Sequence, residues 1–232
     1  MSSLQSPWDA NAAITPSLTV LSIGMRIGWA LVLGAVSARL LRQTQFSLRA
    51  GFTLLVMALC MLPSQWSPSW WLGLACQTPS LVLQSLCGIY LYQQWCSRHD
   101  ALPSQLTENT TWPINLLLIT IGIGWLLALD TFALLTVQLY PIGFTPYAVL
   151  AALFFACLLQ LISARSDHAP QRHHYRLLAV VVLISILVHL FTRLPTGNLW
   201  DALIDPWLWI LAHLYGLNKL MSRIRASLQS EA

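Results

Sequence analysis

The sequence predicts an all-α integral membrane protein with seven transmembrane helices. The first observation is composition, since 56% of the 232 residues are hydrophobic and only 9% are charged. Ordinary soluble domains carry roughly 25% charged residues, so this chain could not cover a soluble surface and must be surrounded by lipid over much of its length. The other two observations are the spacing of the apolar segments and the distribution of the basic residues.

The apolar residues are gathered into segments long enough to be considered as membrane crossings, which need ~20 residues in a helix. We place the seven segments, in chain order, at 17–38, 47–64, 69–95, 113–138, 145–164, 176–194 and 199–217. The second is the weakest because its uncharged run is short, and it can cross only if Arg49 extends to the lipid head groups. Pro79 and Pro206 fall inside the third and seventh segments and predict kinks there.

The basic residues give the predicted topology. When seven crossings are drawn, ten of the twelve Lys and Arg residues fall on one side: Arg39, Arg42, Arg49, Arg98, Arg165, Arg172, Arg176, Lys219, Arg223 and Arg225. By the positive-inside rule this side is cytoplasmic, which places the N-terminus outside and the C-terminus in the cytoplasm. The pI of about 9.0 therefore reflects topology, and we expect no nucleic acid partner. The first 25 residues hold no Lys or Arg, so we expect no cleaved signal peptide.

Residues of the third predicted helix recur at a near-constant spacing in the seventh. Trp71 matches Trp200, Pro79 matches Pro206 and Gly88 matches Gly216. Helices one and five both end in Ser-Ala-Arg, at 37–39 and 163–165. These matches predict a parallel duplication within a single transmembrane domain, 1–232. The alternative is that Leu- and Trp-rich helices with basic ends resemble one another by composition alone.

In this plan a first three-helix unit, 17–98, is joined to a second, 145–225, by a linker helix, 113–138. Three crossings reverse the side of the chain, so a second unit in the same orientation needs one extra helix. Parallel repeats of this kind occur in transporters that bind substrate between their halves. The three-plus-one-plus-three plan resembles the small sugar and vitamin permeases of the SWEET and nicotinamide riboside type. The resemblance is one of architecture, and it carries over no binding residues.

Several polar side chains fall inside the apolar segments, where they are costly and call for a role. The candidate binding residues, all placed toward the outer half of the membrane, are Arg26, Gln77, Thr78, Asp130, His189 and Asp205. We expect Arg26 to pair with Asp130 or Asp205, because an unpaired buried guanidinium is unstable. These groups either line an outward-facing cavity for a solute or proton, or form an ion pair that determines helix packing. A third alternative is that Asp201 and Asp205 lie in the head-group layer and the seventh helix starts late.

No motif in the sequence predicts catalysis, a metal site or a cofactor. His189 and His213 lie at different predicted depths, which disfavours a haem between them. The five cysteines form no C-x-x-C pair. The histidines of segment 164–176 match no established metal-ligand spacing, and we expect a solvated loop there. Neither a Gly-rich phosphate loop nor a nucleophile motif is present, so we expect no enzyme.

Two functions fit these expectations. The first is a small-solute permease of the bacterial cytoplasmic (inner) membrane, with a polar site between two three-helix halves. The second is a non-catalytic accessory, scaffold or assembly subunit of a larger inner-membrane complex. The expected partners are the lipid bilayer with either a small solute or other membrane subunits. A permease requires a cavity between the halves, whereas a scaffold requires a dry centre and an apolar groove on its outside.

Overall fold

The computed structural model describes residues 15–96, 112–167 and 169–230, which form helices joined by loops, without a strand in these ranges. The first part holds α1 (Leu18–Leu40), α2 (Phe46–Cys60), η1 (Ser64–Trp66), α3 (Pro68–Cys76) and α4 (Leu81–Cys96). The second part holds α5 (Ile114–Thr131), η3 (Tyr140–Phe144), α6 (Pro146–Arg165), α7 (Ala169–Thr192), α8 (Leu199–Leu203) and α9 (Pro206–Ser230).

Four of these helices, α1, α5, α6 and α7, are long and apolar enough to cross a membrane. Their outward faces carry large apolar side chains that water would not tolerate in such numbers, among them Leu150, Phe154 and Leu187. The described residues therefore confirm the predicted all-helical class, and these four helices support a membrane protein. α2 has only 15 residues, or ~22 Å of helix, against a hydrocarbon thickness of ~30 Å.

The third and seventh predicted segments are each divided by a break rather than a kink. Residues 77–80 separate α3 from α4, and Ile204 and Asp205 separate α8 from α9. Pro79 and Pro206 lie at these two breaks, where the missing backbone N–H cannot contribute to a helical hydrogen bond.

Two helix boundaries differ from the prediction. The linker helix was expected over 113–138, but α5 ends at Thr131 because Ala133, with φ of 54°, closes a Schellman motif in which Leu134 N donates to Leu129 O. Alanine takes the position that glycine usually occupies, so the sequence carries no stop signal. The expected loop at 164–176 is also wrong in large part, since α7 already begins at Ala169, with Pro170 in its first turn as helix starts favour.

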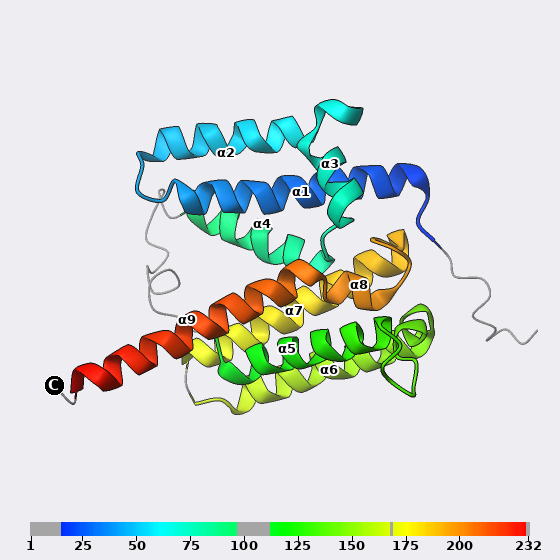
Figure 1. Ribbon diagram of the computed structural model, residues 1–232, viewed down its shortest axis with the longest axis vertical. Coiled ribbons are helices and arrows are strands. Elements are labelled where there is room, and N and C mark those ends of the chain that lie inside the picture. The colour runs from blue at the N-terminus through cyan, green and yellow to red at the C-terminus, as the bar shows by residue number, and fades with distance from the viewer. Residues whose placement is uncertain (1–14, 97–111, 168, 231–232) are drawn as a thin grey trace, which may run out of the picture.

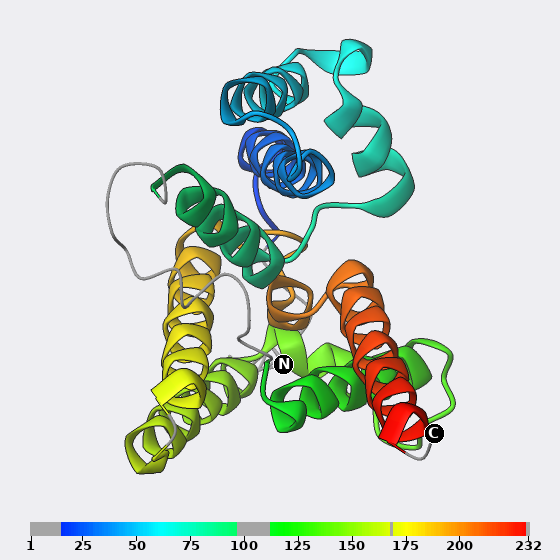
Figure 2. The ribbon, with the colours of Figure 1, turned by 90° about the vertical axis from the view of Figure 1, so that its left-hand side faces the viewer.

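The helices are arranged with α1 to α4 on one side of the molecule and α5 to α9 on the other (Figures 1 and 2). α1 packs against α2 and α4, while α6 packs against α7 and α5 against α9. α4 also contacts α7 and α8, so it connects the two sides. The short helices α3 and α8 lie at the end of the molecule opposite the C-terminus (Figure 1).

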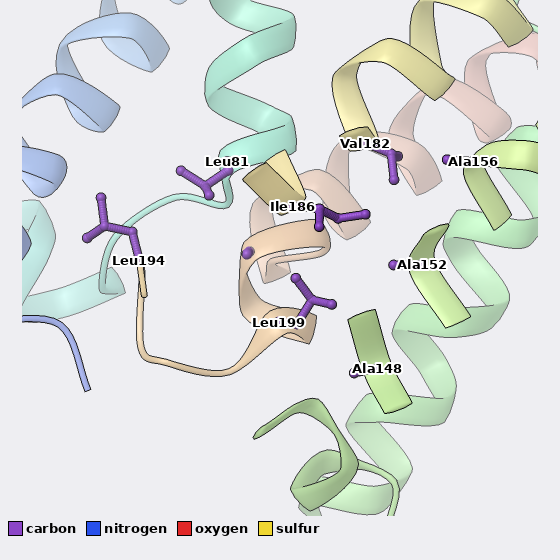
Figure 3. Close-up of a cluster of buried hydrophobic side chains, with 9 residues drawn as sticks. Leu81, Ala148, Ala152, Ala156, Val182, Ile186, Leu194 and Leu199 are labelled. Carbon is purple, nitrogen blue, oxygen red and sulfur yellow. The ribbon is translucent and has the colours of Figure 1, made fainter. Parts of the chain in front are cut away.

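The largest buried apolar cluster joins α6, α7 and α8. Ala148, Ala152 and Ala156 recur every fourth residue along α6 and face Val182 and Ile186 of α7 (Figure 3). Small side chains at this spacing let two helix backbones approach closely, which is the usual source of packing energy between helices in lipid. The cluster holds α8 against the α6–α7 pair and thereby positions the second helix break.

Candidate functional site

The break between α3 and α4 is held open by side chains that bind its carbonyl groups. Gln77 ends α3 with φ of 61°. Its carbonyl oxygen accepts a hydrogen bond from Trp29 Nε1 at 2.9 Å, and that of Pro79 accepts one from Gln84 Nε2 at 2.7 Å. Carbonyl groups released from a helix need such partners where water is scarce, so this break is a built feature of the fold.

A single carboxylate connects this break to the second one. Asp205 Oδ1 accepts a hydrogen bond from Leu208 N at 2.7 Å, in the first turn of α9. Asp205 Oδ2 accepts one from Ser80 N at 2.6 Å, immediately before α4. The residue is only 7% exposed. Because helix N-termini carry partial positive charge, two of them stabilise this buried carboxylate.

α1 passes close to the first break and to the α7–α8 connection at two glycines. A Cβ atom on Gly28 would lie 2.9 Å from Gln84 Nε2 and 3.3 Å from Pro79 Cδ. A Cβ atom on Gly24 would lie 2.7 Å from Leu194 Cδ1, in the connection that leads to α8. Only glycine at these two positions lets α1 lie this close without a shift of the neighbouring side chains. We call α1 residues 24–29, residues 77–84 and Asp205 together the helix-break junction.

The predicted binding residues are only partly brought together. Gln77, Thr78 and Asp205 lie in the helix-break junction, as does Arg26, which is half-buried on α1. Gln77 contributes its backbone carbonyl there, while its side chain is exposed.

His189 lies beside the helix-break junction rather than in it. It is fully buried, and its Nδ1 donates to Leu194 O at 2.8 Å. Leu194 is the residue whose side chain faces Gly24 of α1. His189 therefore supports the connection to α8 rather than opening onto a cavity.

Asp130 belongs to a separate polar network at the end of α5. Its Oδ2 accepts from Tyr140 N at 2.6 Å, and Tyr140 Oη donates to Asp201 Oδ2 at 2.7 Å. Burial, together with the Asp201 carboxylate, raises the pKa of Tyr140. Asn198 Nδ2 donates to Tyr140 O at 2.9 Å, which ties α8 to η3.

The expected ion pair of Arg26 is wrong. Within the described ranges Arg26 is paired with neither Asp130 nor Asp205. The reason is tertiary, because α1 packs against α2, α3 and α4 rather than α5, and both carboxylates are bound by backbone N–H groups instead.

A large cavity lies elsewhere in the described structure, between α4, α5, α7 and α9, with parts of α1, α6 and α8 completing its wall. Its volume is about 970 Å³. Most of its lining is aliphatic, and none of the six predicted binding residues contributes to it. The sequence offered no signal for this cavity, because its lining residues are ordinary leucines, isoleucines and alanines on helices distant in the chain.

The two ends of this cavity differ in chemistry. At one end α1 and α4 finish and α5 and α7 begin, and most of the polar lining residues gather there: Arg39, Gln93, Trp112, His173, His174 and Tyr215. At the other end the cavity is lined by Trp200 and Leu203 of α8 and by Ile204, which follows this helix. Trp112 N donates to Tyr215 Oη at 2.9 Å and Lys219 Nζ donates to Trp112 O at 3.2 Å, which joins α5 to α9 beside the polar end.

A smaller groove of about 470 Å³ lies between α1, α4 and α7. Gly88 leaves open space in its wall, since a Cβ atom on this residue would meet only Leu31 Cδ2, at 3.9 Å. Ser185 also lines the groove, and its buried hydroxyl has no hydrogen-bond partner in the described residues.

Comparison with known proteins adds no relative. No protein-family model, curated protein or solved structure matches this chain. The resemblance to SWEET-type permeases therefore stays one of predicted architecture.

Proposed function

We propose that this protein is a permease for a small solute, with its binding site in the large cavity between two related halves. The observation that carries the proposal is the cavity of about 970 Å³, which is bounded by α4 from the first half and by α7 and α9 from the second. Transporters of repeated architecture bind substrate at such an interface. A scaffold subunit would be expected to have a packed centre instead.

The order of elements supports the duplication. The first half runs through α1, α2, the short α3, a break at Pro79 and then α4. The second half runs through α6, α7, the short α8, a break ending at Pro206 and then α9. α5 takes the place of the linker helix. With each broken pair counted as one crossing, this order supports seven crossings.

The distribution of charge supports the proposed topology. Nine basic residues of the described ranges lie at or beside the ends of α1 and α6, at the starts of α2 and α7, or in the last part of α9: Arg39, Arg42, Arg49, Arg165, Arg172, Arg176, Lys219, Arg223 and Arg225. These helix ends lie toward the C-terminus in Figure 1. Arg98 lies outside the described residues. By the positive-inside rule this end faces the cytoplasm, and the bacterial inner membrane is the proposed location. The polar end of the cavity then faces the cytoplasm.

The proposed mechanism is rocking of one half against the other about the helix-break junction. In the present conformation α8 lines the outer end of the cavity, and the polar end carries exposed Arg39 and His173. Breaks in spanning helices allow short segments to move without disrupting a whole helix. Movement of α3 and α8 would then expose the cavity to the other side.

The test uses accessibility of the cavity to each side of the membrane. In a chain whose five cysteines are replaced, Ala151→Cys places a thiol on the cavity wall. Leu150→Cys, on the same helix, is a matched control, because Leu150 is 62% exposed but does not line the cavity. The permease predicts that impermeant thiol reagents label Ala151→Cys from the cytoplasmic side and, more slowly, from the outside. Leu150→Cys should remain unlabelled in lipid. Labelling of Ala151→Cys from neither side would refute the proposal.

The alternative, an accessory subunit, is favoured by the smaller groove at Gly88 and Ser185. A helix of a partner protein could fit beside Gly88 and supply the acceptor that the Ser185 hydroxyl lacks. Purification distinguishes the two, since an accessory subunit predicts stoichiometric partners that dissociate when Gly88→Leu fills the groove. A permease predicts that the chain is isolated without them.

A further inference from the structure

The large cavity combines a long apolar interior with one cationic end. Its lining on α4 extends from Val82 to Gln93, which corresponds to ~16 Å along a helix axis. The interior is formed mainly by aliphatic side chains, and its far end is lined by Trp200. A compact polar solute would leave most of this apolar wall without a contact, whereas an extended hydrocarbon chain would cover it.

Among the described lining residues, the polar end carries nitrogen groups and no carboxylate. Arg39 and His173 line this end and are exposed, and His174 lies beside them with its Nδ1 donating to Pro170 O. No Asp or Glu occurs among the described lining residues, and Asp167, on the α6–α7 connection six residues before His173, is exposed. A guanidinium in such surroundings favours a carboxylate or phosphate, to which it donates charge-assisted hydrogen bonds.

We propose that the cavity binds a single-chain amphiphile with an anionic head group, its tail directed toward Trp200 and its head group held at Arg39 and His173. This inference rests on the proposed function, since it names the class of solute for that site. The anion is a carboxylate or a phosphate, and the amphiphile is drawn from the cytoplasmic face of the membrane.

The test measures binding to the intact protein in nanodiscs of a zwitterionic lipid, which avoids detergent tails in the cavity. Dodecanoate, dodecyl phosphate and the dodecyltrimethylammonium cation share one tail and differ in the head group. We expect the two anions to bind at least about tenfold more tightly than the cation, and their relative affinity identifies the preferred anion. Equal binding of anions and cation would overturn the proposal.

Two variants locate the head group. Arg39→Gln is expected to weaken dodecanoate binding about tenfold, the loss of one charge-assisted hydrogen bond. Arg42→Gln removes the same charge three residues further on, outside the cavity, and should change binding less than about twofold. Should Arg39→Gln fail to fold, His173→Gln gives the same comparison. Equal effects of the cavity and control variants would overturn the assignment.

Bromine on the tail reports its orientation, because Trp112 and Trp200 lie at opposite ends of the cavity. Dodecanoate brominated at its terminal carbon should quench fluorescence that is lost in Trp200→Phe. Dodecanoate brominated beside its carboxylate should quench fluorescence that is lost in Trp112→Phe. The reverse pattern would contradict the proposed orientation. Bromine quenching combined with labelling of Ala151→Cys from neither side would retain the ligand class but exclude the permease. Labelling from both sides without bromine quenching would retain the permease but exclude the proposed ligand class.

Discussion

Asp205 shows how one residue can determine two helix starts. Its carboxylate binds Ser80 N and Leu208 N, which belong to the beginnings of α4 and α9. The sequence identified Asp205 as a costly buried acid and suggested an arginine partner. The actual partners are backbone N–H groups, which have no sequence signature because every residue except proline carries one.

Asp205→Asn tests this double role. The amide keeps one acceptor oxygen but presents an NH₂ group to the other N–H, so we expect a loss of ~1–3 kcal/mol in the free energy of unfolding. Asp205→Leu should cost more, since both bonds are lost. Thermal unfolding in mild detergent measures the change, with Asp167→Asn on the exposed α6–α7 connection as the control. Equal stability of Asp205→Asn and the control would show that the two N–H groups do not depend on the carboxylate.

Asn198 gives a second residue-scale prediction. Its Oδ1 accepts from Trp200 N while its Nδ2 donates to Tyr140 O. Asn198→Asp retains a good helix cap but places an anionic oxygen against the Tyr140 carbonyl, so we expect ~1–3 kcal/mol of destabilisation despite conservation of the cap. Asn218→Asp, at an exposed position of α9, provides the control in the same unfolding measurement. An unchanged melting temperature for Asn198→Asp would argue against a neutral donor at this site.

At the scale of elements, prolines marked the breaks correctly but not their extent. Pro79 and Pro206 predicted kinks, because a proline removes one hydrogen bond. Full breaks formed because Gln77 adopts a left-handed φ and Trp29, Gln84 and Asp205 bind the groups that the breaks release. The end of α5 at Thr131 could not be predicted, since Ala133 is an unusual residue for its conformation.

Gln77→Gly separates the structural role of this residue from a binding role. Glycine adopts φ of 61° without steric cost, so we expect an increase of up to ~1 kcal/mol in stability. The carbonyl that accepts from Trp29 Nε1 is retained. Gln77→Val should be destabilised by a similar amount, and unfolding of both variants in the same detergent measures the difference. If Gln77→Gly instead abolishes solute binding while remaining folded, the side chain belongs to the binding site.

At the scale of the whole molecule, the prediction that remains to be tested is the number of crossings. Seven crossings place the α6–α7 connection in the cytoplasm and the α5–η3 connection outside. In a cysteine-free chain, Asp167→Cys should be labelled by an impermeant thiol reagent only from the cytoplasmic side, and Gln138→Cys only from the outside; both positions are exposed. Labelling of both cysteines from one side would show that α6 does not cross, and would exclude the seven-crossing plan, the parallel repeat and the proposed orientation of the cavity.

The sequence by itself indicated that lipid surrounds much of the chain, and it predicted the helical class and the approximate position of most helices. These follow from apolar content, segment length and the placement of prolines, all of which act locally or depend on composition alone. The tertiary structure decided which polar groups meet, because the partners of Asp205, Asp130 and His189 are backbone atoms brought near by helix packing. It also decided where the cavity lies, since a space between helices depends on how their side chains fill it, and identical leucines can face lipid, a core or a ligand.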